Sequence, residues 1–237
     1  MTGGGVVRVE VDAALRDLLP RRARAGGAVD VPHEEHATAG HVVQSLGVPL
    51  PEVGALVLDG AAVGAEARPA AGAVLRVSPV RRPQPVPAGG FLLDVHLGTL
   101  ARRMRLLGLD VAWSAHADDP DLVERAVAQD RVLLTRDRGL LLRRALRRGA
   151  LVRGDGPDAE LADVLDRFAP ALRPLTRCTR CGAPLEAVGK DEVEDRLPAG
   201  TRRSYEEFSR CTACAALYWR GAHARRIDDL LRRAGAA

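Results

Sequence analysis

Phe91-Leu92-Leu93-Asp94 and Leu133-Leu134-Thr135-Arg136-Asp137 are the two stretches that decide the fold of this chain. Each contains a short apolar run, which is typical of a strand buried on both faces, and an aspartate follows soon after it. A helix with Leu100 and Met104 on its inner face is expected after the first run. This alternation of strands and amphipathic helices predicts an α/β domain with a mainly parallel sheet and flanking helices over residues 91–174.

Capping and turn residues set the boundaries of the predicted helices in this domain. Gly108 is expected to end the first helix, and Asp119, which precedes a proline, is expected to cap the second. A helix through residues 140–146 and a fourth strand at 151–153 are expected to precede a last helix over 158–168. Three arginines of the first helix are expected to point largely outward: Arg102, Arg103 and Arg105.

Four aspartates stand at or just beyond the carboxyl ends of successive predicted strands: Asp94, Asp119, Asp137 and Asp155. Ligands of open α/β sheets bind outside these strand ends, so residues far apart in sequence are expected to converge there. Carboxylates that share a site repel one another unless a cation neutralises them. The expected catalytic cofactor is therefore Mg²⁺ or Mn²⁺, and two such ions could support phosphodiester cleavage.

Three of these aspartates also have a purely structural interpretation. The alternatives are Asp119 as a helix cap, Asp137 as a salt-bridge partner of Arg136 or Arg138, and Asp155 as a turn residue between Gly154 and Gly156. Asp94 is harder to explain in this way, because an unpaired carboxylate at the end of a buried strand is costly. Asp121 could replace Asp119 in the site, since both belong to the same first helical turn.

The N-terminal residues predict a second, smaller domain. Val7, Val9 and Val11 alternate with charged residues, as in a half-buried strand. Thr38 is expected to cap a short helix that Gly47 closes, and further strands follow. This order of strands around one helix resembles the β-grasp, ubiquitin-like fold, especially the sulfur carriers of thiamine and molybdopterin synthesis. The expected α+β domain covers residues 1–82.

A Pro/Gly segment over residues 83–90 is expected to link the two domains. It ends in Gly89-Gly90, and the sulfur carriers act through a C-terminal Gly-Gly that becomes a thiocarboxylate. Here Phe91 continues the chain, so a carrier role would require cleavage after Gly90. A linker is the favoured interpretation.

Four cysteines form two C-x-x-C pairs in the last quarter of the chain: Cys178, Cys181, Cys211 and Cys214. Each pair can present two thiolates to one tetrahedral Zn²⁺, and a set of four leaves no open position for a catalytic water. The spacing therefore predicts a structural zinc ribbon over residues 175–237, with a C-terminal helix. A redox pair is the alternative, although a thioredoxin-like setting is absent.

Together these motifs resemble the Mut-seven C-terminal ribonuclease family, which are PIN-like nucleases. The resemblance rests on Phe91-Leu92-Leu93-Asp94, on Leu133-Leu134-Thr135-Arg136-Asp137-Arg138 and on the tail Tyr218-Trp219-Arg220-Gly221-x-His223. In that family a zinc ribbon follows the nuclease sheet, and a β-grasp module often precedes it. The resemblance implies that Asp94, Asp119 and Asp137 bind the metal. Of the four aspartates, Asp155 is the one to which this role is carried over least securely. Roles for His96 and His223 stay open.

Composition adds little to the choice of function. The 237 residues carry a net charge of +4, but of the 35 basic residues only Lys190 is a lysine, so the charge is weak support for nucleic-acid binding. No run of apolar residues approaches a membrane span, and a signal sequence is not evident, so a cytoplasmic protein is expected.

The sequence is therefore compatible with three functions. The first is a metal-dependent ribonuclease that cleaves RNA through the aspartates. The second is a non-catalytic RNA-binding or ribosome-associated adaptor, in which the aspartates only cap and bridge. The third is a sulfur-carrier-type β-grasp protein. A protein partner for the β-grasp module is left open.

Overall fold

The computed structural model describes residues 5–219, 227, 229, 230 and 232. The chain divides into two compact units, Met1–Arg82 with Asp137–Leu151, and Pro83–Arg136 with Val152–Ala237. The domain boundaries expected from the sequence stay a prediction. Among the described residues, no helix combines the length and the apolar character that crossing a membrane requires.

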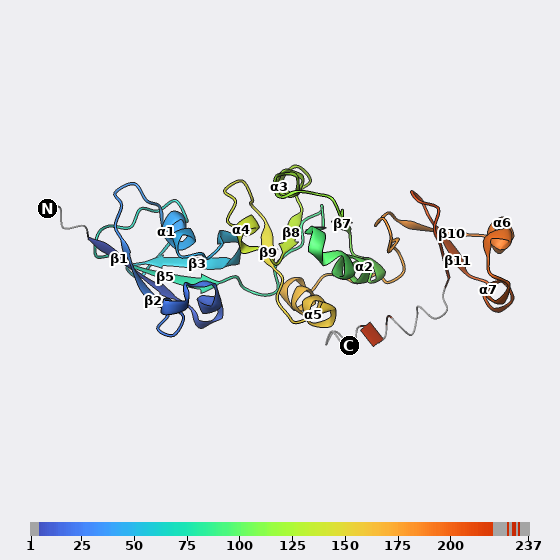
Figure 1. Cartoon of the computed structure of the whole chain (residues 1–237), viewed down its shortest axis with the longest axis horizontal. Helices are drawn as coiled ribbons and strands as arrows, with labels where there is room; N and C mark the ends of the chain where they lie inside the picture. Colours follow the sequence, from blue (N-terminus) through green and yellow to red (C-terminus); the bar gives the residue numbers. More distant parts are fainter. Residues whose placement is uncertain (1–4, 220–226, 228, 231, 233–237) are drawn as a thin grey trace. The chain divides into compact units, whose positions relative to one another are not determined.

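The first unit is built on a mixed five-stranded sheet with the order β2-β1-β5-β3-β4. The first and last strands of this sheet in sequence, β1 and β5, pair in parallel, and the other pairs are antiparallel. Figure 1 shows α1 beside this sheet. The elements are β1 (Val6–Val11), η1 (Ala13–Leu18), η2 (Arg21–Ala23), β2 (Ala28–Pro32), α1 (Ala39–Ser45), η3 (Leu50–Glu52), β3 (Val53–Leu58), β4 (Ala61–Val63) and β5 (Val74–Pro79). The expected β-grasp arrangement is confirmed.

The sequence signals in this unit act as expected. Val7, Val9 and Val11 are buried along β1, while the residues between them face outward or are half-buried. The Thr38 side chain accepts a hydrogen bond from the backbone of His41 at 3.2 Å and caps α1. Gly47 follows the helix with φ +84°, a conformation that favours glycine.

The central α/β region contains a four-stranded sheet with the order β7-β6-β8-β9. Strand β6 pairs in parallel with both β7 and β8. Helix α2 packs against β7 and α5, and α3 packs against β8; Figure 1 shows α3 on one side of these strands and α2 and α5 on the other. The elements are β6 (Phe91–Leu93), η4 (Val95–Leu97), α2 (Gly98–Leu106), β7 (Val111–Trp113), α3 (Asp119–Ala128), β8 (Val132–Thr135), α4 (Arg138–Leu141), β9 (Gly149–Leu151) and α5 (Pro157–Phe168). The predicted mainly parallel sheet is confirmed.

Two of the predicted element boundaries in this region are wrong. The helix expected over 140–146 is the shorter α4, because the Asp137 side chain accepts from the Gly139 backbone and starts the helix earlier. That helix ends after one turn, where the Leu142 backbone N–H bonds back to Arg138 and Gly139. The strand expected at 151–153 is β9, which lies two residues earlier.

Two individual side chains of this region also differ from the prediction. Asp118, not Asp119, caps α3, because its carboxylate accepts from the Asp121 backbone at 2.9 Å, which makes Asp119 the first helical residue. Arg105 does not face outward but is only 2% exposed. It stands four residues after buried Ala101, so both share the inner face of α2.

Gly89 and Gly90 are required by close packing. A Cβ atom on Gly89 would meet the Gln129 carbonyl oxygen at 2.1 Å, and one on Gly90 would meet the Asp110 carbonyl oxygen at 2.6 Å. Gly90 also has φ +73° and accepts a hydrogen bond from the Val132 backbone. The pair therefore has a structural role at the start of β6, which favours the linker interpretation over a sulfur-carrier terminus.

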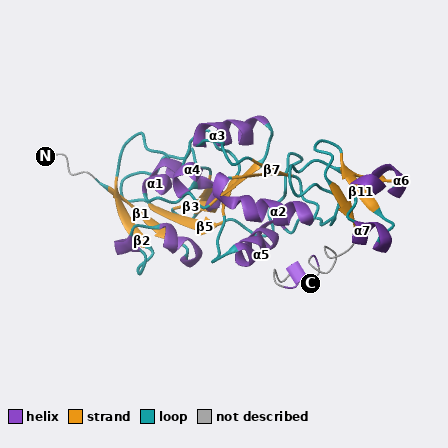
Figure 2. Ribbon diagram, turned by 45° about the vertical axis from the view of Figure 1, so that its right-hand side comes forward, coloured by secondary structure: helices purple, strands orange, loops and turns teal. Residues whose placement is uncertain are grey.

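The C-terminal part forms a small antiparallel sheet, β10-β11-β12, drawn in orange in Figure 2. Its elements are β10 (Leu185–Val188), α6 (Lys190–Val193), η5 (Glu194–Arg196), α7 (Ala199–Ser204), β11 (Phe208–Cys211) and β12 (Leu217–Trp219). Its apolar core is small and consists of Val188, Val193, Leu197 and Phe208. Tyr205, Leu217 and Trp219 pack against this core, so Trp219 supports the ribbon.

Candidate metal centre and acidic site

The four cysteines lie together at one end of the small antiparallel sheet. The Sγ atoms of Cys178 and Cys214 are 3.6 Å apart, those of Cys181 and Cys211 are 3.4 Å apart, and all four lie within 4.8 Å of one another. None of the four is in a disulfide. Among the described residues, this is the one group of three or more potential ligands that could hold a metal ion.

The cysteine geometry fits a tetrahedral zinc ion. Zinc–sulfur bonds of ~2.3 Å in a tetrahedron place the sulfurs about 3.8 Å apart, close to the separations observed. The backbone N–H groups of Ala213 and Cys214 both donate to Cys211 Sγ at 3.4 Å, which stabilises a thiolate. Four thiolates would satisfy the ion completely, so a zinc ion held here would be structural.

Tyr218 connects β12 to the first cysteine pair. Its hydroxyl accepts from the Thr179 backbone N–H at 3.1 Å and lies 3.1 Å from Cys178 Sγ. Burial opposes the Cys178 thiolate, but hydrogen bonds from Tyr218 and from the backbone of Cys181 and Arg180 lower the pKa of this thiol to about 6. The Tyr218 hydroxyl can therefore donate a hydrogen bond to the sulfur of a candidate zinc ligand.

Replacing Tyr218 with phenylalanine is expected to weaken zinc binding about tenfold. The variant loses the hydroxyl that stabilises the Cys178 thiolate and holds the Thr179 backbone, and such supporting contacts typically contribute 10–100-fold in metal affinity. Competition with a chromogenic chelator measures the change. Tyr205→Phe is the matched control, because Tyr205 packs on the apolar core instead. Equal affinity in the two variants would contradict this role.

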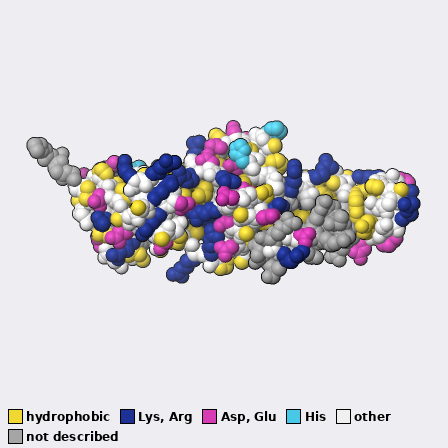
Figure 3. All heavy atoms as spheres, turned by 60° about the horizontal axis from the view of Figure 1, so that its bottom comes forward, with side chains coloured by type: hydrophobic (Ala, Val, Ile, Leu, Met, Phe, Trp, Pro, Cys, Tyr) yellow, Lys and Arg dark blue, Asp and Glu magenta, His cyan; other side chains and the backbone are white. Residues whose placement is uncertain are grey.

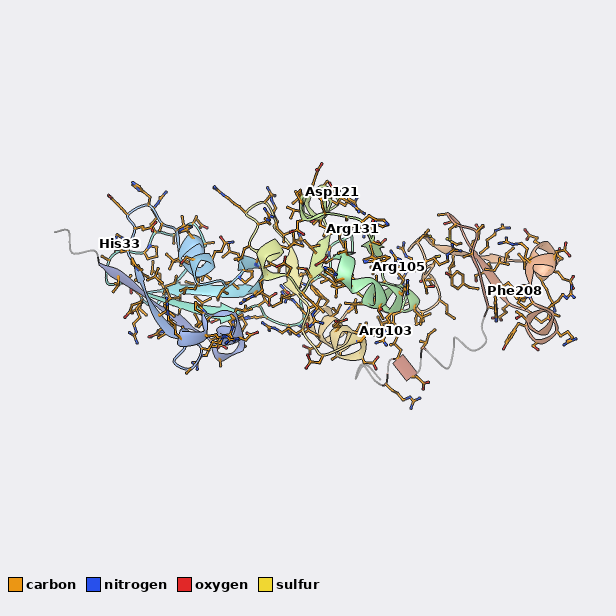
Figure 4. The ribbon with its side chains drawn as sticks, viewed as in Figure 1. His33, Arg103, Arg105, Asp121, Arg131 and Phe208 are labelled. Atoms are coloured by element: carbon orange, nitrogen blue, oxygen red, sulfur yellow. The ribbon has the colours of Figure 1, made fainter. Side chains whose placement is uncertain are left out.

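Arg105 joins the first cysteine pair to the α/β sheet. Its guanidinium, which is labelled in Figure 4, donates to the carbonyl oxygens of Val111 at 3.0 Å and Arg180 at 2.9 Å, with a longer bond to Thr179 at 3.4 Å. Burial lowers the pKa of Arg105, while the neighbouring thiols of Cys181 and Cys178 act in the opposite direction. The side chain thus satisfies backbone carbonyls of the cysteine loop from within α2.

Asp94 lies where two neighbouring parallel strands end. It follows β6, its carboxylate is buried with the residue 6% exposed, and its Oδ2 accepts from the Thr135 hydroxyl at 2.6 Å. Thr135 is the last residue of β8 and is fully buried. The Asp94 backbone N–H is also fixed, because it donates to the Leu134 carbonyl at 3.0 Å. This carboxylate is oriented by the ends of both strands, as the strand-end argument predicts.

The other three aspartates lie at the predicted strand ends or first turns but are less buried. Asp119 is half-buried in the first turn of α3, where Asp121, labelled in Figure 4, is exposed. Asp155 is exposed between two glycines with positive φ. Asp137 is exposed, caps α4, and belongs to the residues grouped with the first unit. Their convergence on a metal stays a prediction.

The arginines beside Asp137 have partners of their own. Arg136 donates to buried Glu160 at 3.0 Å, and Arg138 donates to the Leu18 carbonyl at 3.0 Å. His96 is exposed in η4, two residues after Asp94. His223, with the neighbouring basic pair Arg225 and Arg226, lies outside the described residues.

Three contributing residues were missed from the sequence: Thr135, Arg105 and Tyr218. The available signals were a hydroxyl residue at the end of an apolar strand, an arginine four positions after a buried alanine, and a tyrosine alternating with core-facing neighbours in a strand. Each signal is common in chains that use it only for packing, so the sequence alone does not identify the partners of these three side chains.

A mainly parallel α/β sheet, a ubiquitin-like module and a four-cysteine ribbon define the class of this chain as a multidomain α/β protein with a candidate zinc centre. The Mut7-C RNAse domain model matches residues 89–231, and the Mut7-C ubiquitin model matches residues 5–85. The chain therefore belongs to the Mut7-C RNAse domain family, which indicates a ribonuclease acting on RNA. Searches of curated proteins and of solved structures find no significant match.

Proposed function

We propose that this protein is a metal-dependent, PIN-like ribonuclease that hydrolyses RNA phosphodiester bonds at the acidic strand ends. The membership in the Mut7-C RNAse domain family supports a ribonuclease. The observation that carries the site is the buried Asp94 carboxylate, which the Thr135 hydroxyl orients at the carboxyl ends of β6 and β8. Burying a carboxylate is costly unless hydrogen bonds or a nearby cation compensate for it, and a bound metal ion would supply such a cation.

Asp94, Asp119, Asp137 and Asp155 are the residues proposed to hold Mg²⁺ or Mn²⁺. When bound, such ions activate a water molecule and stabilise the leaving oxygen. Asp94 contributes a fixed carboxylate because Thr135 and its own backbone bond restrict it. The exposed carboxylates of Asp137 and Asp155 are open to solvent and hence to a hydrated ion and a phosphate.

Basic side chains are one part of the charged surface that RNA could meet. On the face that Figure 3 draws, acidic side chains lie among the basic ones. Many arginines are also engaged in pairs, such as Arg131 and Arg177, which both contact Asp110. We therefore expect substrate affinity to depend on the metal site and on a few phosphate contacts, with a modest salt dependence.

A cleavage assay with the full-length protein tests this function. Protein dialysed free of added divalent ions is expected to leave single-stranded RNA intact, and Mg²⁺ or Mn²⁺ is expected to start cleavage, while the zinc content measured in parallel stays constant. If folded, zinc-loaded protein leaves the RNA intact with every divalent ion that is added, the result would count against the proposal.

The second candidate is a non-catalytic RNA-binding adaptor, and the capping contacts favour it. The Asp137 carboxylate caps α4, and Asp118 caps α3, so acidic side chains in this region do serve the helices. The adaptor predicts RNA binding without cleavage in the same samples, which a gel-shift measurement separates from nuclease activity.

A further inference from the structure

The segment that carries Asp137 packs with the β-grasp domain. Residues 137–151, called here the anchored segment, form one compact unit with Met1–Arg82. The anchored segment contains α4 and β9, and its apolar side chains Leu140, Leu141 and Leu146 are buried. Among the described residues, hydrogen bonds of Glu52, Arg138 and Gln44 join the segment to the β-grasp domain.

The first of these bonds uses a buried carboxylate. Glu52, at the end of η3, is 2% exposed, and its Oε1 accepts from the Leu151 backbone N–H at 2.9 Å. Strand β9 and η3 are in contact, so this bond lies within a packed interface. A buried carboxylate is costly unless it is hydrogen-bonded, and here one of its bonds goes to the last residue of the anchored segment.

The other two bonds hold the beginning of the anchored segment. Arg138, directly after Asp137, donates from Nη1 to the Leu18 carbonyl at 3.0 Å. Gln44, in α1, donates to the Leu142 carbonyl at 3.4 Å. The Asp137 carboxylate itself caps α4 through the Gly139 backbone at 2.7 Å. The turn that Asp137 begins is thus held by its own cap and by the bonds of Arg138 and Leu142.

We propose that the β-grasp domain positions the candidate catalytic Asp137, with Glu52 and Arg138 as positioning residues that act through the anchored segment. This inference rests on the proposed ribonuclease function. It gives the ubiquitin-like domain a role within its own unit: the domain fixes the turn that carries the proposed metal-binding carboxylate of Asp137. Small displacements of a reacting group cost large factors in rate, so loss of the anchor is expected to lower turnover more than RNA binding.

The test compares variants of the full-length protein. Glu52→Leu removes the acceptor of the Leu151 N–H, while Glu52→Gln keeps an amide oxygen there. Arg138→Met removes the donor to Leu18 and keeps the aliphatic stem, and Arg147→Met is the matched control, because Arg147 is an exposed arginine of the same segment. The measurements are kcat, KM for RNA, the Mn²⁺ concentration for half-maximal activity, and amide hydrogen exchange of residues 137–151.

For Glu52→Leu and Arg138→Met we expect kcat to fall about tenfold or more and the required Mn²⁺ concentration to rise, with KM within about twofold of wild type. Exchange in the anchored segment should become faster, while β6 should keep its protection. Glu52→Gln and Arg147→Met should behave as wild type. If Glu52→Leu does not fold, Arg138→Met decides, because Arg138 is exposed.

Two results would overturn the inference while leaving the ribonuclease in place. One is an active Arg138→Met protein with wild-type kcat and Mn²⁺ dependence; the other is unchanged exchange over residues 137–151. An inactive wild-type protein is a different result, because it refutes the proposed function and with it the positioning role. Activity of the wild type thus separates the two failures.

Discussion

Replacement of Asp94 by asparagine is expected to lower the rate of RNA cleavage on the order of a hundredfold to a thousandfold. Asparagine has the same shape, and its side-chain oxygen can still accept the hydrogen bond from the Thr135 hydroxyl, so the sheet edge should keep its structure. What the variant loses is the negative charge that attracts a divalent cation. Metal ions contribute several kcal/mol to such transition states, and each ~1.4 kcal/mol is a factor of ten in rate.

Measured initial rates at saturating Mn²⁺ check this expectation, with circular dichroism and zinc content as controls for folding. Asp30→Asn is the matched control, because Asp30 is an exposed aspartate of β2 whose long ion pair with Arg8 contributes little. Parallel Asp119→Asn and Asp121→Asn variants show which residue of the first turn of α3 belongs to the site. Full activity in Asp94→Asn would contradict the assignment of this site.

The architecture could be predicted because its signals are local. Alternating valines identify β1, continuous apolar runs identify β6 and β8, and Thr38 and Gly47 define the ends of α1. The boundaries that differ depend on competition between neighbours: Asp118 and Asp119 can each cap α3, and the choice follows from which carboxylate reaches the Asp121 N–H. The sequence pattern is the same in both cases.

The sequence predicts the two candidate sites in different detail. The spacing of the cysteines indicates metal binding directly, because four thiolates in two close pairs have few other uses. For the aspartates, the sequence predicts only that they lie at strand ends. Whether Asp94 contacts Thr135 depends on the register of β6 and β8. Residues that act through non-local contacts carry no such signal. Glu52 and Leu151, for example, are hydrogen-bonded although they lie 99 positions apart in the sequence.

The second large effect is expected for Cys211→Ser, which should lose the zinc ion and unfold the ribbon. Cys211 is 2% exposed and is the last residue of β11, so its sulfur links the candidate metal centre to the sheet of the ribbon. A structural zinc ion contributes on the order of 10 kcal/mol of folding free energy. The apolar core of this part, four buried side chains including Phe208, is too small to replace that contribution.

Elemental analysis and hydrogen exchange of the variant check this expectation. We expect fast exchange over β10, β11 and β12, and protection that persists in β6 and β8, because their core consists of strand and helix side chains outside the ribbon. The Arg105 contacts define how far the disturbance spreads: its bonds to Thr179 and Arg180 would be lost, while its bond to Val111 would remain. Exchange should therefore rise modestly at the end of α2. Two results would contradict a structural zinc centre. One is wild-type protein that contains no zinc after purification under reducing conditions; the other is a Cys211→Ser ribbon whose amides stay protected from exchange.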